Sequence, residues 1–139
     1  MSQPNDSGAV ATETGPTPYQ RLGGDAAVRA LIDCFYDLID REPAYSDVRK
    51  LHVDLSRSRD KLYWFLSGWL GGPKLYVERF GHPRLRARHL PFAIGVTERD
   101  QWLACMTRAM SERRVEPELA RELLQSLALT ADWMRNRFG

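Results

Sequence analysis

The sequence predicts an all-α fold, and three observations favour it. Apolar residues recur at helical spacing in several long segments, strand-like alternation is absent, and β-branched residues are few. The 139 residues are 43% hydrophobic and 27% charged, which suits one globular domain with a sizeable core. We therefore expect helices packed on helices around a common core.

The composition and charge of the chain disfavour several classes of function. The formal net charge is only +2 and no block of like charges occurs, so nothing favours nucleic-acid binding. No apolar run reaches transmembrane length, and the N-terminus lacks the features of a signal peptide. Cys34 and Cys105 match no metal or redox spacing, so we expect buried thiols, with a disulfide as the alternative. We expect a cytoplasmic monomer or homodimer without nucleic-acid or membrane partners.

The first seventeen residues are rich in Ser, Thr, Pro, Gly, Asn and Asp, which predicts a disordered tail (1–17) before a folded domain (18–139). Gly23-Gly24-Asp25 is a turn that ends in a good N-cap, so we expect a helix from there to about Asp40. Its inner face comprises Val28, Leu31, Ile32, Phe35, Leu38 and Ile39.

Tyr36 lies one turn from Ile32 and Ile39, so its ring is expected to face inward, where its hydroxyl needs a partner. One interpretation is a core tyrosine bonded to the backbone. The other is a hydrogen-bond donor directed into a ligand pocket.

The next helix is predicted to follow a broken polar stretch at 41–57, with Ser56 or Ser58 as its N-cap. It should end at Gly71-Gly72-Pro73, before a loop that contains Tyr76 and Phe80. Its inner stripe comprises Ser58, Leu62, Phe65, Leu66 and Trp69.

Two further long helices are expected towards the C-terminus. A capping-box variant at Thr97–Asp100 predicts the start of one, and Glu116-Pro117 precedes the other. Their inner faces comprise Trp102, Leu103, Met106 and Met110 in the first and Leu119, Leu123, Leu127, Thr130, Met134 and Phe138 in the second.

A short helix bracketed by Pro83 and Pro91 carries the most informative side chain, His89. Pro83 suits the first helical position, and Pro91 should end the helix, so His89 lies in the last turn. A carbonyl there can accept the ring Nδ1–H and leave Nε2 as a metal ligand. Leu85 shares its face, and Arg84, Arg86 and Arg88 surround it. This pattern suits a flat apolar ligand with an iron and acidic edges, such as haem. The alternative is a capped surface helix with a hydrogen-bonded histidine.

Helical folds usually build ligand sites between helices, so His89 can be combined with Tyr36, Trp102, Phe35 and Leu62 from other helices. The Tyr36 O–H and Trp102 N–H could hydrogen-bond a small ligand on an iron opposite His89. The sequence lacks the histidine and cysteine spacing of a zinc site, the phosphate loop of a nucleotide site and the Ser motif of a hydrolase.

Several motifs resemble those of the group II truncated haemoglobins, from about Tyr19 to the C-terminus. The matching residues are Gly23-Gly24, Phe35-Tyr36, Phe65-Leu66-Ser67-Gly68-Trp69-Leu70-Gly71-Gly72-Pro73, Tyr76, Gly81-His82-Pro83, Leu85-Arg86, Arg88-His89, Pro91-Phe92, Glu98-Arg99-Asp100, Trp102-Leu103 and Cys105-Met106. These motifs are highly specific.

The resemblance implies a two-over-two helical sandwich around haem b. His89 then matches the proximal iron ligand, Trp102 and Tyr36 match distal donors, and Ser58 and Leu62 line the distal pocket. The residues expected to contact the cofactor are Phe35, Lys61, Phe65, Tyr76, Arg86, Arg88 and Phe92; among them Lys61, Tyr76, Arg86 and Arg88 occupy positions that often contact the haem propionates.

One segment departs from the family pattern. The family usually has an aromatic residue followed by Pro before the distal helix, whereas this chain has Leu51-His52-Val53-Asp54-Leu55. We expect His52 to take the place of the aromatic residue among the distal ligand-binding residues. The number of donors around the ligand, and whether His52 reaches the iron, stay open.

The resemblance implies reversible binding of O2 and other diatomic ligands such as NO and CO at a ferrous iron, for transport, storage or sensing. The alternative is an enzyme, an NO dioxygenase or a peroxidase-like protein, supplied with electrons by a reductase. Tyr and Trp donors favour slow ligand release, which suits such chemistry better than transport. A haem-free interaction module is a third hypothesis.

Overall fold

The computed structural model of the chain describes residues 15–137, which form helices and contain no strand, so the predicted all-α class is confirmed. Most of the predicted tail, residues 1–14, and Phe138 lie outside this range. The elements are α1 (Pro18–Leu22), α2 (Asp25–Arg41), the 3-10 helix η1 (Pro43–Tyr45), α3 (Ser46–Arg49), α4 (Leu55–Trp69), α5 (Leu75–Phe80), α6 (Leu85–His89), α7 (Val96–Glu112) and α8 (Pro117–Trp133).

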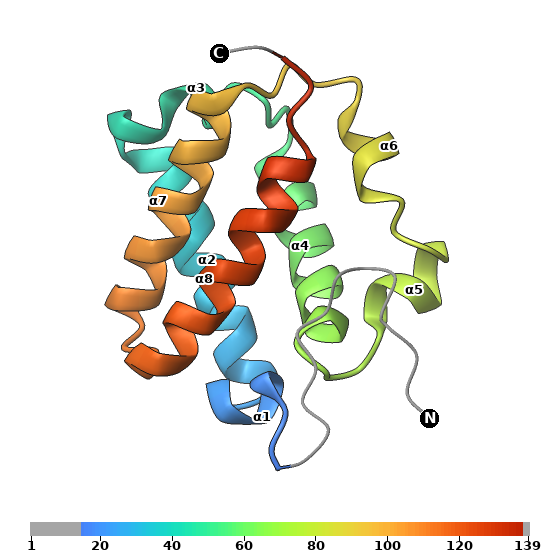
Figure 1. Ribbon diagram of the computed structural model, residues 1–139, viewed down its shortest axis with the longest axis vertical. Coiled ribbons are helices and arrows are strands. Elements are labelled where there is room, and N and C mark those ends of the chain that lie inside the picture. Colours follow the sequence, from blue (N-terminus) through green and yellow to red (C-terminus); the bar gives the residue numbers. More distant parts are fainter. Residues whose placement is uncertain (1–14, 138–139) are drawn as a thin grey trace.

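Four long helices make two layers, as the two-over-two arrangement requires. Helix α2 packs against both α4 and α7, and α7 packs against α8. In Figure 1 the α7–α8 pair lies in front of α2 and α4, whereas α5 and α6 lie to one side. The inner faces predicted from periodicity meet in this core, whose fully buried members include Val28, Ile32, Phe35, Leu38, Cys105, Met106 and Ala109.

The start of α4 differs from the prediction. Asp54 is its N-cap, with extended backbone (φ −131°, ψ 101°) and a carboxylate that accepts the Arg57 N–H at 3.2 Å. The prediction that Ser56 or Ser58 caps this helix is therefore wrong. An N-cap must have non-helical backbone, and both serines already lie within the helix. Ser58 is therefore a half-buried residue within α4 and not its N-cap.

The start of α7 also lies earlier than predicted. Gly95 is the N-cap, and the Glu98 side chain accepts the Gly95 N–H at 2.7 Å. The prediction that Thr97 caps this helix is therefore wrong, because Thr97 is already helical. At α2, likewise, Gly24 is the N-cap with φ 84°, a left-handed conformation that favours glycine, and Asp25 is the first helical residue.

Short helices were harder to predict than long ones. The stretch with Tyr76 and Phe80 is a helix, α5, rather than the predicted loop, and α1 and α3 were not predicted. Helix α6 begins at Leu85, and Arg84 before it has left-handed backbone (φ 49°). The prediction that Pro83 is the first residue of this helix is therefore wrong. One-turn helices contain too few residues to show a hydrophobic period.

Residues 15–137 contain no helix that is both long enough and apolar enough to cross a membrane.

Candidate functional site

His89 is the last residue of α6, as predicted from Pro91. Its Nδ1 lies 2.6 Å from the carbonyl oxygen of Leu85. A carbonyl can only accept, so Nδ1 carries the hydrogen in the neutral ring and Nε2 keeps its lone pair. The half-buried ring makes no other hydrogen bond to residues 15–137. The side chain thus has the tautomer and orientation that a histidine ligand to a metal requires.

Tyr36 lies on the inner face of α2 and is only 4% exposed. Its ring packs edge to face on Phe35, with centroids 5.0 Å apart, and the Arg59 guanidinium lies 5.8 Å from its centre. Burial raises the pKa of Tyr36, and the nearby charge of Arg59 opposes that shift. The phenol therefore stays protonated, and its hydroxyl has no hydrogen-bond partner among the residues that the structure describes. Of the two interpretations from sequence, the unpaired hydroxyl favours a donor directed at a ligand.

His52 lies beside Tyr36, with ring centroids 5.6 Å apart. Its Nδ1 is 2.9 Å from the Val48 carbonyl oxygen, so Nδ1–H donates and Nε2 carries a lone pair. Burial lowers the pKa of His52, the hydrogen bond to the Val48 carbonyl opposes that shift, and the charge of Arg49 lowers the pKa further. A neutral His52 with this tautomer can accept a hydrogen bond at Nε2 and cannot donate one there.

Trp102 brings a second donor from α7. Its ring lies 5.1 Å from that of Phe35, so Phe35 contacts both Tyr36 and Trp102. The indole N–H, like the Tyr36 hydroxyl, has no partner within the described part of the chain. Phe35 thus contacts both Tyr36 and Trp102, and His52 contacts Tyr36, although these residues come from different segments.

Helix α4 presents Ser58, Leu62 and Phe65, all half-buried, at positions one turn apart on one side. The Phe65 ring meets that of Tyr76 on α5, with centroids 6.4 Å apart. This contact joins α4 to α5 at the side that carries the predicted cofactor contacts.

Two predicted propionate contacts meet aromatic rings of α5. Lys61 Nζ lies 6.0 Å from the centre of the Phe80 ring, and the Arg88 guanidinium lies 5.8 Å from that of Tyr76. Tyr76 and Phe80 are themselves in contact, at 4.8 Å. We call Lys61, Tyr76, Phe80 and Arg88 the edge cluster, because it places two cations beside an aromatic surface between α4 and α6.

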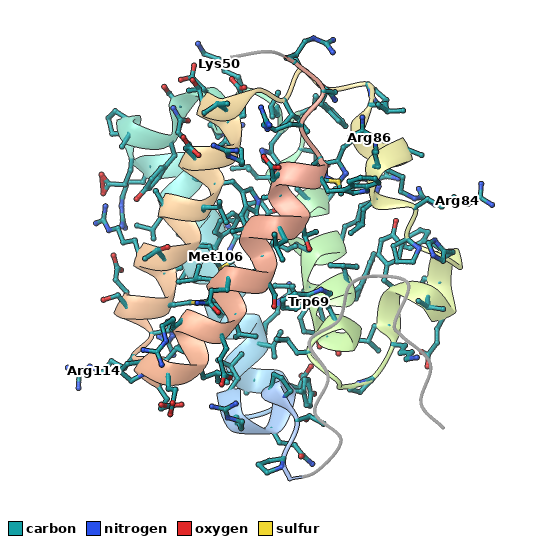
Figure 2. The ribbon with its side chains drawn as sticks, viewed as in Figure 1. Lys50, Trp69, Arg84, Arg86, Met106 and Arg114 are labelled. Carbon is teal, nitrogen blue, oxygen red and sulfur yellow. The ribbon has the colours of Figure 1, made fainter. Side chains whose placement is uncertain are left out.

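Arg86 does not join the edge cluster. Its Nη1 donates to the carbonyl oxygens of Trp133, at 2.6 Å, and Arg135, at 3.1 Å, and its guanidinium lies 5.3 Å from the Trp133 ring. Figure 2 shows Arg86 beside the C-terminal end of α8. The structure therefore directs this arginine at the main chain of another helix.

The residues present fit the ligand expected from sequence, a flat apolar group with an iron and an anionic edge. Large apolar side chains on and beside α5 and α6 stay partly exposed, namely Phe80 (41%), Leu90 (51%) and Phe92 (40%). Covering such side chains with an apolar ligand is favourable, by about 25 cal/mol per Å² of apolar surface. The lone pair of His89 suits the iron, and the cations of the edge cluster suit acidic groups.

Sequence reasoning missed two residues near this site. Arg59 bonds the carboxylates of Asp33 and Asp37 on α2, each at 2.9 Å, which holds α4 beside Tyr36. Asn136, beyond the end of α8, donates to the carbonyl oxygen of His89 at 3.2 Å. The four-residue spacing of Asp33 and Asp37 places two carboxylates on one face of α2, which indicates a cationic partner but does not identify it as Arg59. No local signal marks Asn136, because its partners are more than forty residues away in sequence.

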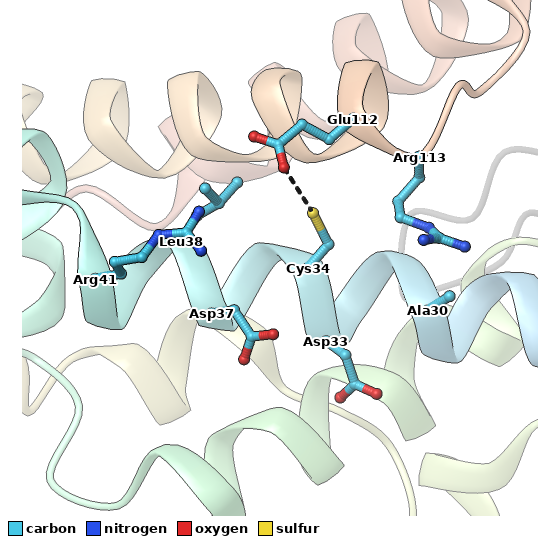
Figure 3. Close-up of a pocket in the computed structure, with 8 residues that line it drawn as sticks. All are labelled: Ala30, Asp33, Cys34, Asp37, Leu38, Arg41, Glu112 and Arg113. Atoms are coloured by element: carbon cyan, nitrogen blue, oxygen red, sulfur yellow. Dashed lines mark hydrogen bonds between the residues drawn. The ribbon is translucent and has the colours of Figure 1, made fainter.

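A separate surface cavity of about 400 Å³ lies between α2 and the C-terminal end of α7 (Figure 3). There the Cys34 thiol faces a carboxylate oxygen of Glu112, with sulfur and oxygen 3.9 Å apart. Burial and the charge of Glu112 raise the pKa of Cys34, so the thiol stays protonated. Cys34 and the buried Cys105 are both free thiols, so the alternative of a disulfide is wrong.

Comparison with known proteins gives one consistent result. Residues 17–136 match the family described as bacterial-like globin. The chain is 40% identical over 120 residues to the group 2 truncated hemoglobin YjbI of Bacillus subtilis (strain 168), a match that covers 86% of this chain and 89% of that protein.

Solved structures agree with this match. The group II 2-on-2 hemoglobin of Agrobacterium tumefaciens superposes with a TM-score of 0.85 at 44% identity, covering 94% of this chain and all of that one. A truncated haemoglobin of Bacillus subtilis described as oxygen-avid gives a TM-score of 0.78 at 40% identity, covering 87% of this chain and all of that one.

Proposed function

Since the chain belongs to the bacterial-like globins, as a group II truncated haemoglobin with haem b as its cofactor, we propose that it binds O2 and other small diatomic ligands at an iron held by His89. The observation that carries the proposal is a set of unpaired polar atoms, two on rings that contact Phe35 and one on the last residue of α6. Among residues 15–137, the Tyr36 hydroxyl and the Trp102 N–H have no hydrogen-bond partner, and Nε2 of His89 has none either. When bound, haem supplies the iron at which the diatomic ligand binds.

The other residues hold the cofactor and shape its pocket. Phe35, Phe65 and Phe92 provide apolar contacts, whereas Ser58 and Leu62 line the distal side from α4. In the edge cluster, Lys61 and Arg88 bind the propionates beside Tyr76. Charge-assisted bonds of this kind add affinity and fix the orientation of an anionic group.

The distal residues favour retention of O2. Tyr36 and Trp102 donate to a ligand that gains partial negative charge, and they do so without giving up a hydrogen bond to any residue that the structure describes. Neutral His52 accepts at Nε2 and so contributes no third donor. The oxygen-avid relative from Bacillus subtilis supports this direction.

The test is reconstitution of the purified chain with haem b, followed by absorption spectra of the ferrous form with and without O2. We expect one haem per chain and a reversible oxygenated spectrum. Replacing His89 by Ala should abolish stable haem retention, because it removes the imidazole whose Nε2 keeps its lone pair and which we take as the iron ligand. The matched control is His82→Ala, since His82 is an exposed histidine of the same segment. Retention of a five-coordinate ferrous haem with an iron–histidine stretch in His89→Ala would overturn the assignment.

The same donors favour a second candidate function, NO dioxygenation, with peroxidase-like turnover as a variant of it. Slow release of O2 gives a second reactant time to arrive. NO, O2 and one electron combine to give nitrate, so a reductase is the partner that this function requires. The test is the rate at which the oxygenated protein consumes NO with a reductant present. Consumption no faster than with free haem would leave O2 binding as the function.

A further inference from the structure

Helix α6 presents His89, yet very little packing holds this helix in place. It is five residues long, it buries none of its own residues, and within residues 15–137 it makes only weak contacts with other helices. In Figure 1 it stands apart from α4, α7 and α8. The direction in which His89 presents its Nε2 therefore depends on the hydrogen bonds that tie α6 to the rest of the chain.

Asn136 provides most of those bonds at the C-terminal end of α6. Its Nδ2 donates to the carbonyl oxygens of Phe92, at 2.8 Å, and of His89, at 3.2 Å. Its Oδ1 accepts the N–H of Ile94 at 3.0 Å, and its own backbone N–H donates to the Ile94 carbonyl at 2.8 Å. One side-chain amide thus uses its donors and its acceptor on the turn that follows His89.

Arg86 ties the other end of α6 to the same part of the chain. Its guanidinium donates to the carbonyls of Trp133 and Arg135, where the C-terminus of α8 leaves carbonyl oxygens without helical partners. Arg86 and Asn136 therefore join α6 and its following turn to residues 133–136 in both directions.

We propose that Asn136 is a positioning residue for the proximal histidine. The Leu85 carbonyl sets the rotation of the His89 ring, and Asn136 holds the His89 carbonyl, so the last turn of α6 is fixed on both sides of the imidazole. Without the amide, residues 89–94 keep only backbone hydrogen bonds to residues 136 and 137, through the Ile94 carbonyl, and Nε2 is presented over a wider range of directions. The inference rests on the proposed function in taking His89 as the iron ligand.

Asn136→Asp is the discriminating variant, because it keeps the shape and an acceptor for the Ile94 N–H but cannot donate to the carbonyls of His89 and Phe92. Asn136→Ala removes the three side-chain bonds to His89, Phe92 and Ile94, together with the bond that Oδ1 accepts from Arg137. The control is Arg137→Ala, since the side-chain bonds of Arg137 within the described residues go only to Asn136.

Three measurements are made on each variant: the iron–histidine stretching band of the ferrous protein, the rate of haem transfer to an acceptor protein, and amide hydrogen exchange at residues 90–94 of the haem-free chain. For both Asn136 variants we expect a shifted or broadened stretching band and haem transfer faster by about tenfold or more, the usual scale for partners of a metal ligand. Exchange at 90–94 should also accelerate, and Arg137→Ala should stay within about twofold of wild type.

An unchanged stretching band in Asn136→Asp would overturn the positioning role, even if haem transfer were faster, because that pattern indicates a stability effect alone. If the wild-type chain bound no haem and the Asn136 variants still lost exchange protection at 90–94, the proposed function would be rejected. The anchoring of the turn by Asn136 would be retained.

Discussion

His52 and Tyr36 meet edge to face, with ring centroids 5.6 Å apart and ring planes at 82°. His52 donates its Nδ1–H to the Val48 carbonyl, so its remaining nitrogen can only accept while the ring is neutral. In the proposed site, the distal side therefore has donors from Tyr36 and Trp102 and an acceptor from His52. This division of roles decides what each substitution should do.

Removal of either distal donor should accelerate O2 release. Tyr36→Phe and Trp102→Phe keep an aromatic ring and remove the O–H or N–H, which limits cavity effects. Each lost bond should cost about 1–3 kcal/mol, or roughly 5- to 150-fold in the dissociation rate of O2. Release of CO, a less polar ligand, should change less. Stopped-flow measurement of both ligands checks this.

The double variant Tyr36→Phe with Trp102→Phe provides the internal control for that prediction. Both donors serve one small ligand, so their effects should not be additive. Equal O2 dissociation rates in wild type and all variants would show that neither side chain touches the ligand, and the donors would have to be sought elsewhere.

His52 should make the stability of the haem-free chain depend on pH. Burial lowers its pKa below the ordinary value of 6.5, so on acidification the unfolded chain takes up a proton that the folded chain does not. The contribution of neutral His52 to the free energy of unfolding is therefore fully present above about pH 6.5. It is lost as the pH falls through and below that value. His52→Phe should lose less free energy of unfolding than wild type between pH 7.5 and 5.0, measured by urea denaturation. An equal loss in both proteins would contradict the assignment of a buried neutral His52.

The cations of the edge cluster should affect haem affinity more than ligand release. Lys61→Gln and Arg88→Gln each remove a charge that is at least partly exposed, so each should cost less than about 1 kcal/mol, roughly a two- to fivefold faster haem transfer. Rates of O2 dissociation should stay near wild type. Arg114→Gln is the matched control, because Arg114 is exposed and lies across the molecule from α6 (Figure 2). If Arg114→Gln lost haem as fast as the Lys61 and Arg88 variants, the faster haem transfer would follow from the change in net charge and not from these two positions.

The N-cap of α4 gives a test of fold stability away from the iron ligand. Asp54→Ala removes the carboxylate that accepts the Arg57 N–H and should lower the free energy of unfolding by about 1 kcal/mol. Ser56→Ala, at an exposed position already inside the helix, should change it little. Denaturant unfolding of the haem-free variants compares the two. A larger loss for Ser56→Ala would restore the helix start expected from sequence.

Local patterns determined the four long helices and the candidate proximal ligand. The inner faces of α2, α4, α7 and α8 follow from periodicity, because each apolar stripe must be buried whatever it packs against. The hydrogen bond from His89 to Leu85 spans only four residues, and Pro91 ends the helix, so both were predictable. The helix caps were less predictable. At the start of α4, Asp54, Ser56 and Ser58 all have side chains that suit an N-cap, and only the backbone conformation shows that Asp54 takes that position.

Only the tertiary structure decided which partners distant side chains take. Arg86 has the charge of a propionate ligand, but its guanidinium turns to the carbonyl oxygens of Trp133 and Arg135, 47 and 49 residues along the chain. Asn136 reaches the turn after His89, and His52 comes to lie beside Tyr36, through the packing of whole helices. Such contacts depend on the relative placement of elements, whereas periodicity reports only the face that an element buries. For that reason the candidate iron ligand, His89, could be predicted from the sequence, whereas its contact with Asn136 could not.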